Sequence, residues 1–379
     1  MAAKTSTPVE TLEAESKKFW NNEMEAIIGI MFVLIILGTI NVFSASFIKA
    51  DLEQGTPYYY LWRQGANLAV GLVAFIICFR CDYRLWRRYT PFILAFTMLS
   101  LILVLLIGPE VNGAKRWLGY GALRFQPAEI AKLVAIMIAA AYLARQVRHN
   151  LEIKIFTPQM GLIAVMFALT EIEPDMGTAC IILGVPLIML IVAGLDRQKV
   201  YMMSGAALVG AIAMILRNPY RLNRLKIVLD PWSDAQNYGY QTVQSLSAIG
   251  SGELTGMGLG VGMSKYEYLP EAHTDFAFAI FCQENGFLGA IFVLLLFAAL
   301  AVYATRIAAK ARDEFGQMLS IGIMILIVGQ AIGNLLMVGG MFPVVGIPLP
   351  FISYGGTSLI VTMAAMGILA NIGRLGNND

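Results

Sequence analysis

Charged residues and histidines are scarce in this sequence. Only 14% of its 379 residues are Asp, Glu, Lys or Arg, and 58% are hydrophobic, whereas soluble domains carry about 25% charged residues. This balance indicates an integral membrane protein. The two histidines, His149 and His273, are too few for histidine-rich metal chemistry, which leaves carboxylates as the main candidates for proton transfer.

Cysteine is also scarce and does not form the pattern of a disulfide framework. Cys78 and Cys81 make a C-x-x-C, but neither a second pair nor a histidine lies near them, so we expect no zinc site there. The other two cysteines are Cys180 and Cys282.

Long apolar runs dominate the chain instead. A helix needs roughly 17–25 residues to cross a bilayer, and most of the runs approach this length. Only helices and closed barrels satisfy their backbone hydrogen bonds in lipid, and continuous apolar runs are typical of helices. The sequence therefore predicts an all-α, polytopic transmembrane bundle of about ten helices. The expected spans lie near 26–46, 64–79, 90–107, 128–144, 158–171, 176–195, 198–216, 283–304, 317–340 and 351–373.

The distribution of lysine and arginine predicts the orientation. With ten spans and a cytoplasmic N-terminus, the inside loops hold most of the basic residues. We therefore expect both termini in the cytoplasm. The N-terminal stretch up to Glu23 is polar, and its charges are spaced as on a short surface helix. Because a full-length span follows this stretch, we expect no cleavable signal peptide. The expected segments are a cytoplasmic N-terminal segment over 1–23, a transmembrane domain over 24–374 and a C-terminal tail over 375–379.

One loop is too long for a simple connection. It is extracytoplasmic in the expected orientation, covers 217–274 and joins the seventh and eighth spans. Its stretch GSGELTGMGLGVG is dense enough in glycine to fold tightly over the bundle or to approach a ligand closely. No strand precedes it, so it is not a nucleotide-binding fingerprint, and we expect no nucleic-acid partner. Basic residues in this outer loop oppose the usual charge bias and suggest an anionic ligand.

Two polar clusters fall on the same expected outer side. The first, from Asn112 to Lys132, carries basic residues ahead of a helix that opens with Pro127. Glu129 and Lys132 are three residues apart and can pair on one helix face. The cluster is either a salt-bridged helix start at the lipid headgroups or part of a binding site.

The second cluster, EIEPDMG, places Glu173 and Asp175 on either side of Pro174 between two spans. It is either a polar turn or a turn that directs a carboxylate into a cavity.

Two further acids lie in KYEYLPEAHTDFAFAIFCQENGFLG, which begins at Lys265. Asp275 opens a span, where the helix dipole would favour a carboxylate for structural reasons, but acids at membrane depth are also candidates for function. Glu284 lies nine residues later, on nearly the opposite side of a helix. We therefore do not expect the two acids to act as one dyad.

These features together fit one kind of substrate. Arginine and lysine recognise phosphate, and a lipid-linked diphosphate would present its phosphates at the membrane surface. A carboxylate beside it could accept a proton from a sugar hydroxyl.

Several motifs along the chain resemble those of the SEDS family of shape, elongation, division and sporulation proteins, and they keep the family's order. The resemblance extends over nearly all of the expected spans. It implies a peptidoglycan glycosyltransferase that polymerises lipid II, an undecaprenyl-diphosphate-linked disaccharide peptide, at the outer face of the bacterial cytoplasmic membrane. It also implies a class B penicillin-binding protein as transpeptidase partner. The motifs are QPAEIAK at 126–132, EPDMGTA at 173–179, DPW at 230–232, GYQTVQSLSAIGSGELTGMGLG at 239–260, YLPEAHTDF at 268–276 and PLPFISYGGTS at 348–358.

The resemblance also assigns roles to individual residues. Asp275 matches the family's essential aspartate and is the expected general base. The chain departs from the family at Gln283, where paired glutamates are common. The residues expected to bind substrate are Lys115, Arg116, Gln126, Glu129, Lys132, Asp175, Tyr240, Gln241, Ser245, His273 and Ser353; Pro231, Gly355 and Gly356 also fall on family motifs.

Two questions stay open at this level. The motif GYQTVQSLSAIGSGE resembles the division and sporulation branch, whereas FPVVGIPLP is closer to the elongation branch, and we favour the division type. The same polar cavity in a helical bundle would also suit a lipid II flippase, or a scaffold that recruits a transpeptidase. We expect a divalent cation, Mg²⁺ or Mn²⁺, to assist the reaction and no organic cofactor to take part.

The predicted orientation can be tested by cysteine labelling. In a variant without the native cysteines, Tyr240→Cys should react with an impermeant reagent in intact cells, whereas Arg312→Cys should react only after the membrane is opened. The opposite pattern would contradict the predicted topology.

Overall fold

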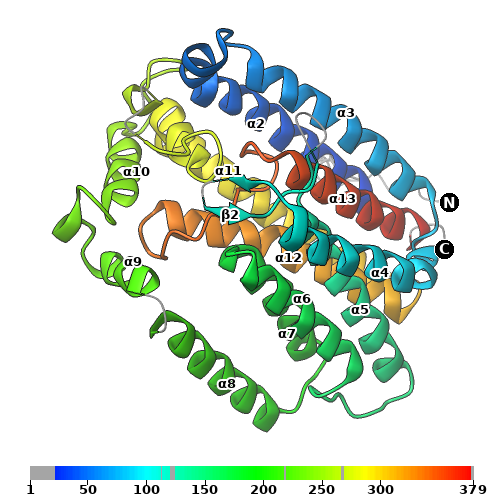
Figure 1. Ribbon diagram of the computed structural model, residues 1–379. Helices are drawn as coiled ribbons and strands as arrows, with labels where there is room; N and C mark the ends of the chain where they lie inside the picture. Colours follow the sequence, from blue (N-terminus) through cyan, green and yellow to red (C-terminus); the bar gives the residue numbers. More distant parts are fainter. Residues whose placement is uncertain (1–21, 112, 120–123, 217–218, 266–268, 377–379) are drawn as a thin grey trace, which may run out of the picture.

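The chain forms a bundle of long helices, as expected (Figure 1). The computed structural model describes residues 22–111, 113–119, 124–216, 219–265 and 269–376. The surface helix expected within 1–23 and the end of the tail, 377–379, lie outside the described residues. The long helices are α2 (Glu23–Gln54), α3 (Tyr59–Arg80), α4 (Tyr83–Ile107), α5 (Pro127–Arg148), α6 (Pro158–Ile172), α7 (Met176–Val192), α8 (Arg197–Leu216), α11 (Ala277–Ala309), α12 (Glu314–Val338) and α13 (Gly356–Gly376).

Each expected span corresponds to one of these helices. Within the described residues, seven of them are long and apolar enough to cross a membrane, and α6 and α7 are shorter apolar helices. Several helices begin at polar residues whose side chains accept hydrogen bonds from the first turn, as Asp82 does from Arg84 N at 2.9 Å and Asp313 from Gly316 N at 2.8 Å. Proline occupies the first turn of α5 and of α6.

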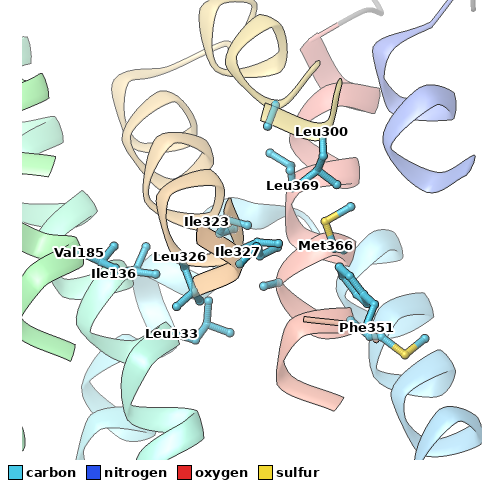
Figure 2. Close-up of a cluster of buried hydrophobic side chains, with 14 of the residues drawn as sticks. Leu133, Ile136, Val185, Leu300, Ile323, Leu326, Ile327, Phe351, Met366 and Leu369 are labelled. Atoms are coloured by element: carbon cyan, nitrogen blue, oxygen red, sulfur yellow. The ribbon is translucent and has the colours of Figure 1, made fainter. Parts of the chain in front are cut away.

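Helix α5 lies at the centre of the bundle. In its most apolar stretch 89% of the residues are buried, and it packs against α4, α7 and α12. Figure 2 shows Leu133 and Ile136 of α5 in the same cluster as Val185 of α7 and Leu326 of α12. Because lipid is as apolar as these side chains, close packing rather than hydrophobic transfer stabilises such contacts.

The opposite layer is made by α2, α3 and α13, which pack against one another. Small residues allow their backbones to approach closely. A Cβ atom at Gly38 of α2 would overlap the carbonyl of Phe351, and one at Gly367 of α13 would overlap the carbonyl of Phe75 on α3.

Helix α8 lies at the edge of the bundle (Figure 1), and most of its described side chains are exposed and none is buried. The loop that follows it contains α9 (Pro219–Leu229), the 3₁₀ turns η1 (Pro231–Asp234) and η2 (Met263–Lys265), and α10 (Tyr240–Ser251). Figure 1 shows α8, α9 and α10 along one side of the molecule, away from α3 and α13. A short antiparallel hairpin, β1 (Glu110–Val111) and β2 (Ala114–Lys115), precedes α5.

Helix α11 is broken at Gly286, whose φ of 65° and ψ of −167° are not helical. The glycine-rich loop fills this break with backbone hydrogen bonds: Gly258 N donates to Glu284 O at 3.1 Å, and Phe287 N donates to Glu253 O at 2.9 Å. The expected tight fold of the glycine-rich stretch over the bundle is confirmed, since Gly256 lies directly against Gly286.

Gly286 should not tolerate a side chain. Its dihedral angles belong to a region that only glycine adopts without strain, and a Cβ there would overlap Gly256 N. We expect Gly286→Ala to destabilise the protein by at least about 1–3 kcal/mol, measured by unfolding in detergent. The matched control is Gly205→Ala in α8, where no atom lies within 4 Å of the new Cβ and where alanine is favoured over glycine by up to about 1 kcal/mol. Equal stability of the two variants would contradict this account of the break.

Candidate active site

Asp275 lies in the turn just before α11, and its main chain is held by α12. Asn334 Nδ2 of α12 donates to Asp275 O at 2.8 Å and to Ile347 O at 2.6 Å. The N-cap of α11 is Phe276, which has no capping side-chain hydrogen bond. No described residue donates a hydrogen bond to the Asp275 carboxylate. Of the two roles left open above, a helix-capping aspartate is therefore not supported by the geometry.

The loop that joins α12 to α13 passes directly beside this carboxylate. Gly346, with φ of 73°, leaves so little room that a Cβ atom on it would lie 3.3 Å from Asp275 Oδ2. The Asp275 side chain is half-buried. Asp275 is thus held by α12 through its main-chain oxygen, while its carboxylate lies beside Gly346 and lacks a hydrogen-bonded partner among the described residues.

Asp175 forms a second polar centre, where α5, α7 and α13 meet. It caps α7 by accepting hydrogen bonds from Thr178 N at 3.2 Å and Thr178 Oγ1 at 3.0 Å. Gln126 Nε2 donates to Asp175 Oδ2 at 2.7 Å, and Gln126 N donates to Thr357 Oγ1 at 3.1 Å. The expected polar turn is real, and its carboxylate is buried and satisfied.

Arg116 is fixed against the same turn. Its Nε donates to Glu173 O at 3.4 Å, and its terminal nitrogen donates to Pro174 O. Glu173 itself is fully buried, and its two carboxylate oxygens have no hydrogen-bond partner among the described residues. Burial raises the pKa of Glu173 to about 8, and the charge on Asp175 adds to that rise. Arg116 therefore faces one carboxyl that is largely neutral and one that is hydrogen-bonded.

Asp275 lies close enough to Asp175 and Arg116 for their charges to affect its pKa. Burial raises its pKa to about 7, and Glu271 and Asp175 raise it further, whereas Arg116 and Arg224 act in the opposite direction. A general base works best when its pKa lies near the working pH. The arrangement gives Asp275 this property and sets two guanidinium groups nearby, where an anionic group would be attracted.

His273 lies two residues before Asp275 in the chain, but it is buried among aromatic rings. Its ring centroid is 4.7 Å from that of Tyr60 and 5.7 Å from that of Tyr354. Burial lowers the pKa of His273 to about 4, helped by the charge of Lys49. The imidazole is therefore neutral at pH 7, and its main-chain oxygen accepts a hydrogen bond from Tyr354 N at 2.9 Å.

A chain of polar contacts connects α5 to the loop beside Asp275. Lys132 Nζ lies 2.8 Å from Glu129 Oε2, which confirms the expected pairing, and both side chains are almost fully buried rather than at the headgroups. Lys132 also donates to Gln330 Oε1 at 2.9 Å, and Gln330 Nε2 donates to Pro348 O at 2.9 Å. Ser353 Oγ closes the same loop by accepting from Leu349 N at 2.9 Å.

Comparison with known proteins identifies this arrangement. The family model described as a cell cycle protein, FTSW_RODA_SPOVE, matches residues 24–378. The chain belongs to the FtsW/RodA/SpoVE family. It is 36% identical to stage V sporulation protein E of Bacillus subtilis, over 91% of this chain and 95% of that protein. It is 38% identical to the probable peptidoglycan glycosyltransferase FtsW of Trichlorobacter lovleyi, over 95% of this chain and 96% of that protein.

Two solved structures of similar proteins have the same fold. One, from a peptidoglycan synthase complex that coordinates polymerization and crosslinking, superposes with a TM-score of 0.74 at 27% identity and covers 93% of this chain and 98% of that chain. The rod shape determining protein RodA of Thermus thermophilus superposes with a TM-score of 0.66 at 25% identity, covering 93% of this chain and 97% of that chain.

Other residues expected from the family resemblance lie in separate places. Ser245 Oγ donates to Val338 O at 2.7 Å and fixes α10 to α12. Tyr240 and Gln241 begin α10, and the described contacts do not connect their side chains to Asp275. Lys115 lies opposite Glu110 in the hairpin and forms no ion pair with a described residue. Their roles in binding substrate stay predictions.

Sequence reasoning did not place Arg224 or Glu271 at the site. Arg224 belongs to α9 and donates a hydrogen bond to Val344 O, in the loop between α12 and α13. Its positive charge lowers the pKa of Asp275. Glu271 precedes Asp275 by four residues, in the same turn. The one available signal was the group of basic residues in the outer loop, which indicated an anionic ligand but not which side chain would face it.

Glu284 belongs to a different buried cluster. Its Oε1 lies 3.1 Å from Lys265 Nζ and accepts hydrogen bonds from Ser44 Oγ at 2.5 Å and Gly260 N at 3.1 Å. Next to it, Gln283 Oε1 accepts from Ser264 N at 3.3 Å. Glu284 therefore anchors the glycine-rich loop to α11, and the expectation that it does not form a dyad with Asp275 agrees with its separate set of partners.

The buried Glu129–Lys132 pair predicts a characteristic stability pattern. Removing one partner leaves an uncompensated buried charge, so Lys132→Met should destabilise the protein by about 3–5 kcal/mol. Replacing both by apolar residues of similar size, Glu129→Leu with Lys132→Met, should restore much of that loss. Unfolding of the two variants in detergent tests this. A double variant no more stable than Lys132→Met would contradict it.

Proposed function

We propose that this protein is a peptidoglycan glycosyltransferase that polymerises lipid II at the outer face of the bacterial cytoplasmic membrane. The observation that carries the proposal is the state of Asp275, whose carboxylate has a pKa raised to about 7 and no hydrogen bond from a described residue. The activity in the printed names of relatives such as FtsW of Trichlorobacter lovleyi supports it.

The reaction is an inverting glycosyl transfer. The 4-hydroxyl oxygen of one saccharide attacks the anomeric carbon of another, while the bond from that carbon to the diphosphate oxygen breaks. Asp275 accepts the proton of the attacking hydroxyl, and undecaprenyl diphosphate leaves with the electron pair of the broken bond. A carboxylate with a pKa near 7 holds this proton more strongly than an ordinary aspartate does, and it is still largely ionised at slightly alkaline pH.

Arg116 and Arg224 are the groups best placed to offset the charge of the diphosphate. Arg116 is fixed by the carbonyls of Glu173 and Pro174, and Arg224 by the carbonyl of Val344. Donors that are held in place before the reaction stabilise developing charge without reorganisation. Lys115, which ends β2 directly before Arg116, is a further candidate for binding the sugar or phosphate groups.

The part of the chain that the structure describes offers no preformed cage for the expected divalent cation. Within the described residues, no group of three or more His, Cys, Asp or Glu side chains could hold a metal ion. The proposed reaction has no step that uses a metal, and the requirement for Mg²⁺ or Mn²⁺ stays a prediction.

The proposed orientation places both termini in the cytoplasm and Asp275 outside, as the basic loops indicate. A class B penicillin-binding protein is the proposed partner, supported by the similar chain in a peptidoglycan synthase complex. Its transmembrane helix would pack on α12, where Ile332 and Leu336 are exposed beside Gly329. Relatives named FtsW and stage V sporulation protein E support the division and sporulation branch.

Replacing Asp275 by Asn should abolish polymerisation without unfolding the protein, because the amide keeps the shape but cannot accept the proton. We expect the rate to fall about 10²–10⁴-fold. The assay is conversion of labelled lipid II to polymer by the purified protein alone, with the melting temperature as folding control. Glu253→Gln, which neutralises an exposed acid of the same outer loop, is the matched control and should be active.

The outcomes of that assay separate the three candidate functions. A flippase or a scaffold would give no polymer with the purified parent protein. If the parent polymerises lipid II and Asp275→Asn does so equally fast, the enzyme assignment stands and Asp275 is not its base.

The rate should also depend on pH in a definite direction. The reactive form of Asp275 is the deprotonated one, so kcat/KM should rise with pH up to about 7 and level off above it. Initial rates measured from about pH 5 to about pH 9 test this. A rate that is already nearly level from about pH 5 upward would indicate the ordinary aspartate pKa of about 4 and show that the carboxylate is not perturbed.

A further inference from the structure

A groove opens at the end of the bundle that is farthest from Asp275, where α4, α5 and α6 meet. Helix α11 begins just after Asp275 and runs to Ala309 at the other end of the bundle. The start of α4 lies at that other end, because Arg84 pairs at 3.0 Å with Asp313, which follows α11. The groove has a volume of about 680 Å³, within the range of about 300–1,000 Å³ typical of small-molecule sites.

The walls of this groove are largely apolar. They come from the first turns of α4, from the last turns of α5 and from the start of α6, so the groove runs from the end of the bundle toward the membrane interior. The apolar lining residues are Pro91, Leu94, Ile138, Ala141, Leu151 and Leu162.

Two arginines, Arg87 and Arg145, line the same groove at its mouth. Both are exposed, and neither forms an ion pair with a described residue. Arg87 lies over the ring of Phe315, with its guanidinium carbon 5.9 Å from the ring centroid. The neighbouring acid Asp313 is already engaged by Arg84, Tyr83 and Gly316. Asp313 therefore already has a basic partner in Arg84, and it forms no ion pair with Arg87 or Arg145.

The loop beside the groove has the composition of a membrane–water interface. Tyr142 OH accepts a hydrogen bond from Lys154 N at 2.8 Å and donates one to Lys154 O at 3.0 Å, which fixes the α5–α6 connection next to the groove. In this connection Leu151 and Phe156 are 51% and 89% exposed. Exposed apolar and aromatic side chains beside arginines are typical of the headgroup region.

We propose that this groove binds one anionic phospholipid, with its phosphate at Arg87 and Arg145 and an acyl chain along the apolar wall. Arginine pairs well with phosphate oxygens, and basic pockets between membrane helices on the cytoplasmic side bind anionic headgroups. A free phosphate would use the mouth alone, whereas a phospholipid also covers the wall. The inference uses the orientation proposed above but does not depend on the glycosyltransferase activity.

The test uses the full-length protein purified in a neutral detergent. It is titrated with phosphatidylglycerol or with phosphatidylcholine of the same acyl chains, and retained lipid is counted by native mass spectrometry. We expect the parent protein to retain one phosphatidylglycerol in preference to phosphatidylcholine. Each basic residue near anionic lipid contributes about 1 kcal/mol, so Arg87→Gln with Arg145→Gln should weaken this binding roughly 30-fold.

Two control variants separate this site from general surface charge. Arg80→Gln with Arg88→Gln removes the same charge from exposed arginines that do not line the groove, and it should change the affinity less than about threefold. Ala141→Phe fills the apolar wall without altering charge and should also weaken binding of phosphatidylglycerol. The melting temperature of each variant in detergent reports whether it is folded.

Several results would overturn the proposal. These are an absence of preference for phosphatidylglycerol in the parent, equal losses in the two double-arginine variants, or full binding by Arg87→Gln with Arg145→Gln. Binding of inorganic phosphate with the same arginine dependence, together with no effect of Ala141→Phe, would show a soluble anion site instead. A folded Ala141→Phe variant that loses phosphatidylglycerol while it keeps both arginines would support the lipid.

Discussion

A carboxylate inside a membrane bundle must be paired, hydrogen-bonded or neutral, because the surroundings cannot solvate its charge. This protein uses each solution at a different acid. Glu129 and Glu284 are ion-paired with lysines, and Asp175 is satisfied by Thr178 and Gln126. Asp275 has a raised pKa and no such partner among the described residues. The site depends on this difference, since the satisfied acids hold the scaffold together and Asp275 can exchange a proton.

Most of the helices could be predicted from the sequence, because apolar runs and polar N-caps are local signals. The misjudged ends have physical reasons. The expected span 283–304 misses the first turns of α11, which begins at Ala277, because polar residues around Glu284 interrupt the apolar run. The expected span 351–373 begins too early, because the apolar stretch at Phe351 forms a turn, with φ of 66° at that residue, before α13 starts at Gly356.

The candidate site was only partly predictable. Asp275 and Asp175 were found as acids at or between expected spans, and their roles came from family motifs; the Glu129–Lys132 pair was found through its spacing of three residues on a helix. The influence of Arg224 on Asp275 was not found, because it depends on how α9 packs beside the loop before α13. The break at Gly286 was also missed, since it exists only when a distant glycine-rich loop supplies the hydrogen bonds that the helix gives up. Long-range pairing of this kind leaves no periodic pattern in the sequence.

The attachment of the glycine-rich loop to α11 has a consequence for how this protein can change over evolution. The loop is fastened at Gly256 by the broken helix and at Lys265 by Glu284, so the chain is already fixed before it reaches Asp275. Helix α8 lies ahead of both attachment points and is separated from Asp275 by them. It can therefore diverge in length and sequence to suit new lipids or partners, while the geometry around the carboxylate is inherited unchanged.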